Sequence, residues 1–259
     1  MDMGLQGRTA LLTGASRGMG RACAEALARE GVDLTLVARG SGPLEETAAA
    51  IRAASGVRVT TVAADISTEA GRAAALAACP DPDILLANAG GMKPGDFRQW
   101  SREDWIAAVD LMMLPPILLT RAVVDGMMAR GFGRIVAIAA RTVKCPQPEL
   151  GLSNGARSGV VGFLAGLGRQ TVRRNVTINT LLPGIIASEA QREHVDVLAQ
   201  HDPQRFKEIW ASRAAENPAG RYGRPEEIGA AFCFLCSAHA GFITGQSLMI
   251  DGGSYPGTF

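Results

Sequence analysis

Short, nearly continuous apolar runs alternate with longer helical patterns along the whole chain. The short runs are rich in Val, Ile, Leu and Thr, which is typical of strands buried on both faces. They occupy Thr9–Thr13, Asp33–Ala38, Val57–Ala63, Ile84–Ala87, Arg134–Ala139, Thr177–Leu182 and Ser247–Ile250. The longer patterns predict helices at Gly20–Glu30, Leu44–Ala54, Glu69–Ala78, Arg102–Arg130, Gly155–Arg174 and Glu226–Ser237.

This alternation predicts an α/β fold, because parallel strands need a crossover helix and the crossovers are right-handed. We expect a single doubly wound Rossmann domain over residues 1–259, with a sheet of about seven parallel strands and helices on both faces. No Pro/Gly/Ser-rich linker and no internal repeat divides the chain. Residues 188–221 depart from the alternation, being charged and helical after the sixth strand. Ligands bind at carboxyl ends of parallel strands, so we expect a substrate lid here; a solvated helical excursion is the alternative.

Composition excludes several classes of protein. Hydrophobic residues make up 47% and charged residues 20%, which is enough apolar material for a core. The net charge of +1 argues against nucleic acid as a partner. No apolar run in the sequence approaches the length of a membrane span, and the N-terminus lacks the pattern of a secretory signal. Five dispersed cysteines fit a reducing compartment, so a cytoplasmic location is expected.

A glycine-rich loop follows the first strand and opens the first helix. Such loops bring backbone N–H groups close to a pyrophosphate at a helix N-terminus. The second strand ends in Arg39, where an NAD enzyme carries an acid for the ribose hydroxyls, so NADP(H) is preferred over NAD(H). Arg17 is a second candidate phosphate contact; ordinary surface charges are the alternative reading of both arginines. The expected loop contacts are Gly14, Ser16, Arg17, Gly18, Met19 and Gly20.

Together with further motifs, this loop makes the chain similar to the short-chain dehydrogenase/reductase family, especially its bacterial 3-oxoacyl-acyl-carrier-protein-reductase-like members. Asp65-Ile66 resembles the family's adenine-contacting pair, and Asn88-Ala89-Gly90 resembles the motif beside the cofactor. The segment 183–188 resembles the stretch that holds the nicotinamide carboxamide. The resemblance therefore implies cofactor contacts at Asp65, Ile66, Asn88, Ala89, Gly90, Arg157, Pro183, Gly184, Ile186 and Ser188.

The resemblance also implies a catalytic Tyr, a Lys four residues later, a Ser before them and an Asn in the preceding helix. In this sequence those positions hold Ser153, Arg157, Ala140 and Asp110. Both tyrosines of the chain, Tyr222 and Tyr255, lie beyond the sixth strand, so no shift of the alignment restores the Tyr. The sequence therefore predicts a degenerate catalytic tetrad.

Chemistry limits what the replacements can do. Arg157 stays protonated, so it is expected to hold ribose hydroxyls and place positive charge near the reacting oxygen. Ser153 is a weak acid, and nothing in the sequence pattern could activate it. Lys144, in the loop after the fifth strand, is the best candidate donor, because a desolvated lysine can give up its proton near neutral pH. The alternatives are a solvated loop lysine and, for Asp110, either a retained hydrogen bond or a solvated helix position.

The remaining features predict structure rather than chemistry. Cys233 and Cys236 have metal-site spacing but lie within an apolar helix, and the three histidines are scattered, so no metal site is expected. Four glycines form a small-residue face on one helix, which predicts close approach of another backbone. Members of the family that the chain resembles pair this helix across a subunit interface, so the resemblance implies a homodimer or homotetramer; close packing on the sheet is the alternative. These glycines are Gly155, Gly159, Gly162 and Gly166.

The leading functional hypothesis is an NADP(H)-dependent oxidoreductase acting on the carbonyl or alcohol group of a small-molecule substrate, with a rebuilt proton donor. A nucleotide-binding subunit or regulator without chemistry is a second hypothesis. A lyase or isomerase that reuses the cleft is a third.

Overall fold

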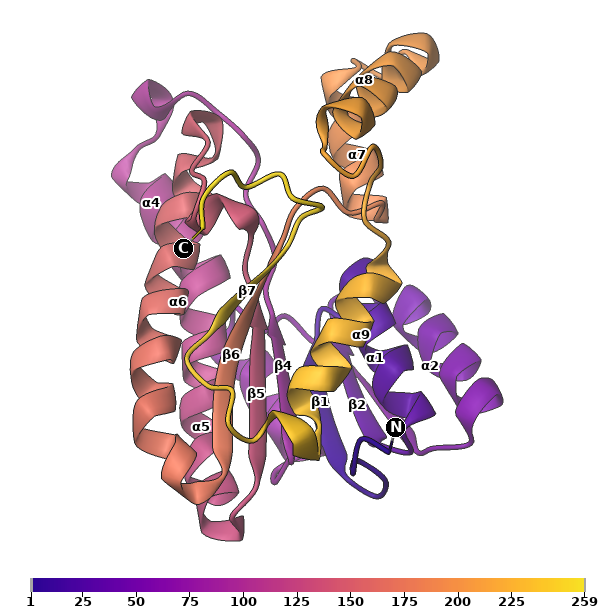
Figure 1. Ribbon diagram of the computed structural model, residues 1–259, viewed down its shortest axis with the longest axis vertical. Helices are drawn as coiled ribbons and strands as arrows, with labels where there is room; N and C mark the ends of the chain where they lie inside the picture. The colour runs from indigo at the N-terminus through magenta and orange to yellow at the C-terminus, as the bar shows by residue number, and fades with distance from the viewer. Residues whose placement is uncertain (1, 259) are drawn as a thin grey trace.

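The computed structural model describes residues 2–258 and contains a seven-stranded parallel sheet of order β3-β2-β1-β4-β5-β6-β7 (Figure 1). The predicted fold class is thereby confirmed. All seven strands fall where the apolar runs predict them, with small differences at their ends. The strands are β1 (Thr9–Thr13), β2 (Asp33–Ala38), β3 (Val59–Ala63), β4 (Ile84–Asn88), β5 (Gly133–Ile138), β6 (Val176–Pro183) and β7 (Ser247–Ile250).

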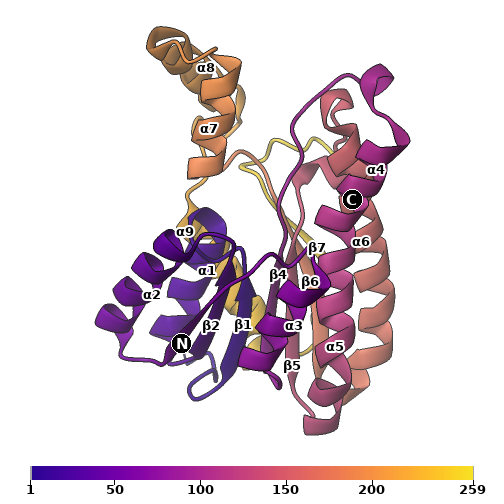
Figure 2. The ribbon, with the colours of Figure 1, turned by 180° about the vertical axis from the view of Figure 1, so that it is seen from behind.

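Helices cover both faces of the sheet (Figures 1 and 2). One core cluster joins the sheet to α1 (Gly18–Arg29), α2 (Ser41–Ser55) and α9 (Pro225–Cys236). The second cluster joins the opposite face to α3 (Glu69–Ala78), α5 (Leu114–Arg130) and α6 (Gly151–Thr171). Leu12 contributes to the first cluster and Leu11 to the second, as the alternation of side chains along a strand requires.

The single helix predicted at 102–130 is present over its whole length, but it contains a π-helical turn that the sequence did not predict. It is divided into α4 (Arg102–Ala108), a π-helical turn (Val109–Met113) and α5. Pro115 and Pro116 explain the division, because proline has no N–H to donate and is tolerated in the first turn of a helix, where both residues lie. This stretch is also long and apolar enough to cross a membrane by length and composition, which the sequence reading had not found. In the structure, its α5 part packs on the sheet through Leu119, Val123 and Met127.

The small-residue face of α6 serves two purposes. A Cβ on Gly155 would stand 3.0 Å from the Trp105 ring, and one on Gly159 would stand 2.8 Å from the Met113 sulfur. These two glycines therefore admit the side chains of the preceding helical segment. At Gly162 and Gly166 a Cβ would meet nothing within 4 Å. The second pair of glycines therefore faces open space.

The cysteine pair in α9 belongs to the core. Cys233 and Cys236 are buried in the first core cluster, together with Cys23 of α1. Burial raises the pKa of the Cys233 thiol to about 11, which keeps it protonated at neutral pH. Among residues 2–258, no group of His, Cys, Asp and Glu side chains could hold a metal ion.

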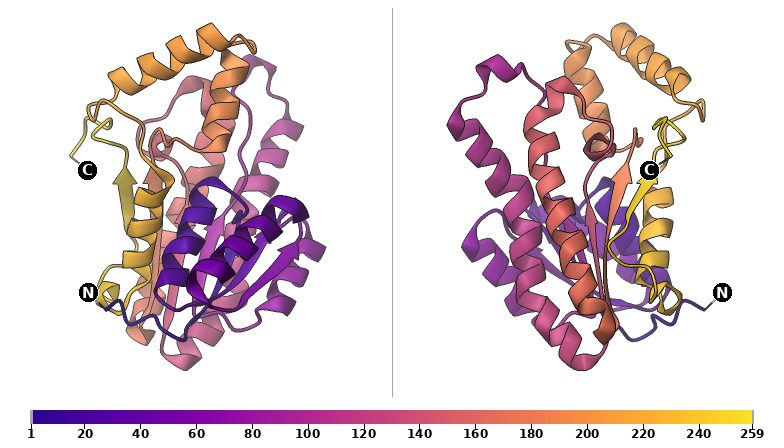
Figure 3. Two further views of the ribbon diagram at one scale, coloured as in Figure 1. Left: turned by 90° about the vertical axis from the view of Figure 1, so that its right-hand side faces the viewer. Right: turned by 60° about the vertical axis from the view of Figure 1, so that its left-hand side comes forward.

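Residues 188–221 form a pair of helices, α7 (Glu189–Leu198) and α8 (Pro203–Glu216), above the carboxyl ends of the strands (Figures 1 and 3). An aromatic stack fastens α8 to the segment that returns to the sheet. Trp210 stacks on Phe206 and on the buried Tyr222, with ring centroids 5.6 and 3.9 Å apart. Tyr222 therefore has a packing role in this structure.

The carboxyl ends of β1 and β4 are joined by a buried hydroxyl. Thr13 Oγ1 lies 3.0 Å from the carbonyl oxygens of Leu86 and Asn88 and accepts a hydrogen bond from the Asn88 N–H at 2.9 Å. Thr13 is fully buried, so neither strand end can replace these bonds with water.

We expect Thr13→Val to lower the free energy of unfolding by roughly 1–3 kcal/mol, because the Asn88 N–H loses its acceptor. Thr13→Ser keeps the hydroxyl and should cost only about 1 kcal/mol for the lost methyl group. Urea denaturation of both variants measures the difference. A Val variant as stable as the wild type would show that the hydroxyl does not hold the two strands together.

Candidate functional site: a nucleotide cleft

The glycine loop presents the N-terminus of α1 to the space above the sheet. Gly14 and Gly18 adopt φ values of +62° and +56°, which disfavour other residues. A Cβ on Gly20 would stand 2.0 Å from the Gly14 carbonyl oxygen, so only glycine lets the helix approach the loop this closely. Arg17 precedes α1 without a side-chain cap. The first N–H groups of α1 are therefore available to an anion.

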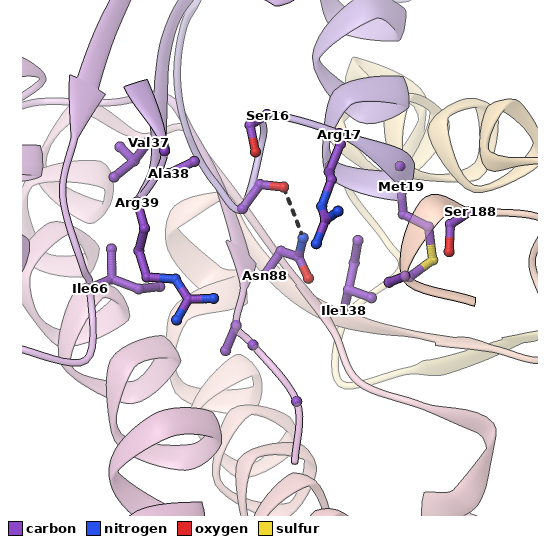
Figure 4. Close-up of a pocket in the computed structure, with 18 of the residues that line it drawn as sticks. Ser16, Arg17, Met19, Val37, Ala38, Arg39, Ile66, Asn88, Ile138 and Ser188 are labelled. Atoms are coloured by element: carbon purple, nitrogen blue, oxygen red, sulfur yellow. Dashed lines mark hydrogen bonds between the residues drawn. The ribbon is translucent and has the colours of Figure 1, made fainter. Parts of the chain in front are cut away.

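A cavity of about 630 Å³ opens beside this loop at the carboxyl ends of the strands (Figure 4). It brings together most of the predicted cofactor contacts from six separate stretches of the chain. These residues are Gly14, Ser16, Arg17, Gly18, Met19, Gly20, Arg39, Asp65, Ile66, Asn88, Ala89, Gly90, Arg157 and Ser188.

Three predicted contacts do not line the cavity. Pro183 and Ile186 are buried, and a Cβ on Gly184 would stand 2.7 Å from the Asp251 Cβ. Ile186 pairs with Gly223 in an isolated bridge at the base of the lid. In this structure, these residues form the support of the lid and not the wall of the cavity.

The end of the cavity at β2 and β3 carries one exposed cation and one fixed carboxylate. Arg39 follows β2 and is exposed. Asp65 accepts hydrogen bonds from the N–H and the hydroxyl of Ser67, at 2.9 and 2.8 Å. These bonds, with a smaller contribution from Arg39, hold the pKa of Asp65 below its usual range. The carboxylate is therefore ionised and fixed in place, whereas the guanidinium can turn toward an anion.

Asn88 connects the middle of the cavity to the glycine loop. Its Nδ2 donates to the Gly14 carbonyl at 3.3 Å, the bond drawn in Figure 4. A Cβ on Gly14 would stand 2.6 Å from the same nitrogen, so glycine is needed for this contact as well. Asn88 thus sets the position of the loop that carries the phosphate site.

At the opposite end, Arg157 of α6 is held by three acceptors. Its Nη1 donates to the Ile138 carbonyl at 3.0 Å, its Nη2 to the Gly90 carbonyl at 2.8 Å, and its Nε to Ser153 Oγ at 3.2 Å. Desolvation lowers the pKa of Arg157 to about 10, so the group remains cationic at neutral pH. Arg157 therefore places a fixed positive charge in the cavity wall between the ends of β4 and β5.

The contact with Arg157 corrects the expectation that Ser153 has no partner. The two residues lie one turn apart on α6, which begins at Gly151 and not at the predicted Gly155. Residues four apart face each other only if both are helical, and the predicted boundary left Ser153 outside the helix.

Of the four predicted catalytic residues, Arg157 lines the cavity, whereas Ser153, Lys144 and Asp110 do not. Lys144 follows a short 3-10 turn (Arg141–Val143) and is exposed, so the desolvation expected of a lysine donor is not found in this structure. Asp110 is also exposed, on the π-helical turn. Its neighbour Leu111 lines the cavity instead. The π-helical turn changes which side chain of this segment faces the site.

The cavity also contains residues that the motifs did not indicate. Val37, Ala38, Ala64, Ile138 and Ala139 lie at or just after strand ends, where the general rule for parallel sheets could have found them. Glu189 and Ala190 belong to the lid, for which only the composition of the segment gave a signal.

Fold and site together define a dinucleotide-binding protein of the Rossmann class, with the glycine loop at the β1–β4 crevice. The family described as enoyl-(acyl carrier protein) reductase matches residues 14–255. The 3-oxoacyl-[acyl-carrier-protein] reductase FabG of Vibrio harveyi is 34% identical over 259 residues, covering 98% of this chain and 99% of that protein. The chain belongs to the short-chain dehydrogenase/reductase family and is similar to its 3-oxoacyl-acyl-carrier-protein reductases.

Two further relatives act on sugars or sugar acids by name. Gluconate 5-dehydrogenase of Gluconobacter oxydans is 30% identical over 253 residues, covering 96% of this chain and 95% of that protein. The solved structure of L-sorbose reductase from Gluconobacter frateurii, complexed with NADPH and L-sorbose, has a TM-score of 0.94 at 32% identity, covering 99% of this chain and all of that one.

We expect Arg157→Met to lower the free energy of unfolding by about 1.5–3 kcal/mol, because the Gly90 and Ile138 carbonyls lose a charged donor. Arg157→Lys should restore part of this loss, since an ammonium can reach at most some of the same acceptors. Arg169→Met, on an exposed position of the same helix, is the matched control. Equal denaturation midpoints for the Arg157→Met and Arg169→Met variants would contradict the assigned role.

Proposed function

We propose that the protein is an NADP(H)-dependent oxidoreductase that interconverts a carbonyl and an alcohol on a small molecule, using an active site without the family's Tyr. The proposal rests on the single cavity that joins Arg39 at one end to Arg157 at the other. Relatives that reduce or oxidise carbonyl and alcohol groups, by their names, match the chain over nearly its whole length.

The cavity fits an NADP(H) cofactor. The uncapped start of α1 suits the pyrophosphate, and the exposed Arg39 suits a 2′-phosphate at a strand end that carries no acid. The L-sorbose reductase structure contains NADPH, in line with this preference. A bound NADP(H) would supply the hydride that the carbonyl carbon of the substrate takes up in reduction, or accept the hydride that the alcohol carbon loses in oxidation. The chain's own part is to position the two groups and exclude water.

Arg157 and Ser153 would orient the reacting oxygen. Two hydrogen bonds to backbone carbonyls fix the guanidinium, which leaves further N–H groups for a ribose hydroxyl or for negative charge on the substrate oxygen. Ser153 accepts from Arg157, so its own O–H remains able to donate to that oxygen. Arg157 is cationic and does not exchange a proton at neutral pH.

The proton donor is a separate proposal. Lys144 can reach the substrate oxygen only if the loop after β5 folds inward when the site fills, because in this structure the side chain is exposed. Because Lys144 is exposed, the structure shows no proton donor from this loop in the cavity. This observation favours one alternative function, that of an NADP(H)-binding regulator that catalyses no reaction. Turnover with a carbonyl substrate separates this alternative from the enzyme.

We also propose a homodimer or homotetramer in a reducing cytoplasm. The open pair Gly162 and Gly166 flanks Phe163, whose side chain is exposed on α6. An apolar helix face of this kind is suited to packing against its copy in a second subunit. All five cysteines are free thiols.

Arg39→Ala should weaken NADPH binding about 10- to 100-fold and leave NADH nearly unchanged, because a charge-assisted phosphate contact is worth about 1.5–3 kcal/mol. Fluorescence titration with each cofactor measures both constants. Equal losses for NADPH and NADH would show that Arg39 supports the fold instead of reading the phosphate.

Lys144→Met should lower kcat about 10²–10⁴-fold, with NADPH affinity changed by only a few-fold, if the lysine supplies the proton. Ser153→Ala should keep most of the turnover, because a serine that only donates a hydrogen bond is not the acid. Steady-state kinetics of both variants shows whether Lys144 or Ser153 is the proton donor. Full activity of the Met variant would reject Lys144, and a fall beyond about 100-fold in the Ala variant would make Ser153 the donor.

A further inference from the structure

An ion pair joins the lid to the glycine loop. Both carboxylate oxygens of Glu193, on α7, accept hydrogen bonds from the two terminal nitrogens of Arg17; the Nη2–Oε2 distance is 3.4 Å. Arg17 lies directly before α1 and lines the cavity. A contact between residues this far apart in the sequence fixes the position of α7 relative to the phosphate-binding loop.

A second carboxylate lies close to the same loop. Glu189 is one turn before Glu193 on α7, and its Oε2 would be 3.4 Å from a Cβ on Gly18. Ser188 Cβ would be 3.3 Å from that atom. The first turn of α7 thus packs directly on the turn that exposes the N-terminus of α1, where anions bind favourably.

The two arginines at the cavity are not equivalent in this state. Arg17 is paired with Glu193, whereas no ion pair of Arg39 occurs among residues 2–258. A guanidinium offers two forks of paired N–H groups to a carboxylate or a phosphate, one formed by Nη1 and Nη2 and one by Nε and a terminal nitrogen, and Glu193 holds the Nη1–Nη2 fork of Arg17. Because Glu193 occupies that fork, a phosphate group can use it only after the carboxylate has left.

We propose that Glu193 is a cofactor-specificity residue, which competes with the 2′-phosphate of NADP(H) for Arg17 and releases α7 when the phosphate takes its place. This inference rests on the proposed NADP(H) site. NAD(H) has no 2′-phosphate, so it has no group that could replace the Glu193 carboxylate at Arg17. The release of α7 therefore depends on the 2′-phosphate, the group that distinguishes NADP(H) from NAD(H).

The expected effect is modest, because both partners are largely in contact with water. The Arg17 and Glu193 side chains are 52% and 60% exposed, and exposed ion pairs are weak. Removing the competing carboxylate should accordingly tighten NADPH binding by about two- to five-fold, with little change for NADH.

The test is titration of the wild type, Glu193→Gln, Arg17→Ala and the double variant with NADPH and with NADH. Glu208→Gln is the matched control, because it removes one negative charge from the lid at a residue that bonds only to Gln204 of its own helix. We expect Glu193→Gln to bind NADPH more tightly than the wild type and Glu208→Gln to bind it equally. In the Arg17→Ala background, Glu193→Gln should have no effect, because the two residues act on the same step.

Three results would overturn the inference: unchanged NADPH affinity in Glu193→Gln, a gain that persists without Arg17, or equal changes for both cofactors. The last would show that the ion pair only positions the lid. If the wild type binds no NADPH, the proposed function itself fails, and this outcome is distinct from the other three.

Discussion

The site depends on the junction of β1 and β4. These strands are neighbours in the sheet, but the chain leaves them toward opposite faces, β1 toward α1 and β4 toward the π-helical turn and α5. The buried Thr13 hydroxyl holds their carboxyl ends together, and Asn88 holds the glycine loop above them. A crevice at such a switch point is where open parallel sheets bind ligands. Every other feature of the site is arranged around this crevice.

Arg157 joins strand ends in a similar way at the end of the cavity near β4 and β5. It joins the Gly90 carbonyl, which follows β4, to the Ile138 carbonyl, which ends β5, and it also holds Ser153. An arginine with a planar fork and several donors can satisfy these acceptors together, which a lysine cannot. Of the residues that the resemblance aligns with the family's catalytic positions, Arg157 and Ser153 are therefore in contact, whereas Asp110 is exposed on the π-helical turn. Under the proposed function, this pair would supply charge and orientation to the reacting oxygen, and Arg157, with a pKa of about 10, would remain cationic at neutral pH.

The strands lie where the sequence predicted them, because buried apolar runs are a local pattern. The glycine loop and Arg39, which were also found from local patterns, line one cavity. The sequence did not predict features that depend on irregular helix geometry or on contacts between residues far apart in the chain. Pro115 and Pro116 produced a π-helical turn that exposes Asp110. The first turn of α6 is made of small and polar residues, so the sequence pattern did not show that the helix begins at Gly151. The contact between Arg157 and Ser153, one turn apart on this helix, was missed for the same reason. The pairing of Arg17 with Glu193 depends on how the lid folds back, which no local pattern contains.

The most direct test of the account is transfer of deuterium from NADPH labelled stereospecifically at C4 of the nicotinamide to a panel of carbonyl compounds, followed by mass spectrometry of the alcohols. The account predicts that the purified protein transfers deuterium from one face of NADPH only, to at least one member of the panel, and far more efficiently than from labelled NADH. Saturable NADPH binding with no deuterium in any product would contradict it and identify the protein as a cofactor-binding protein without redox chemistry.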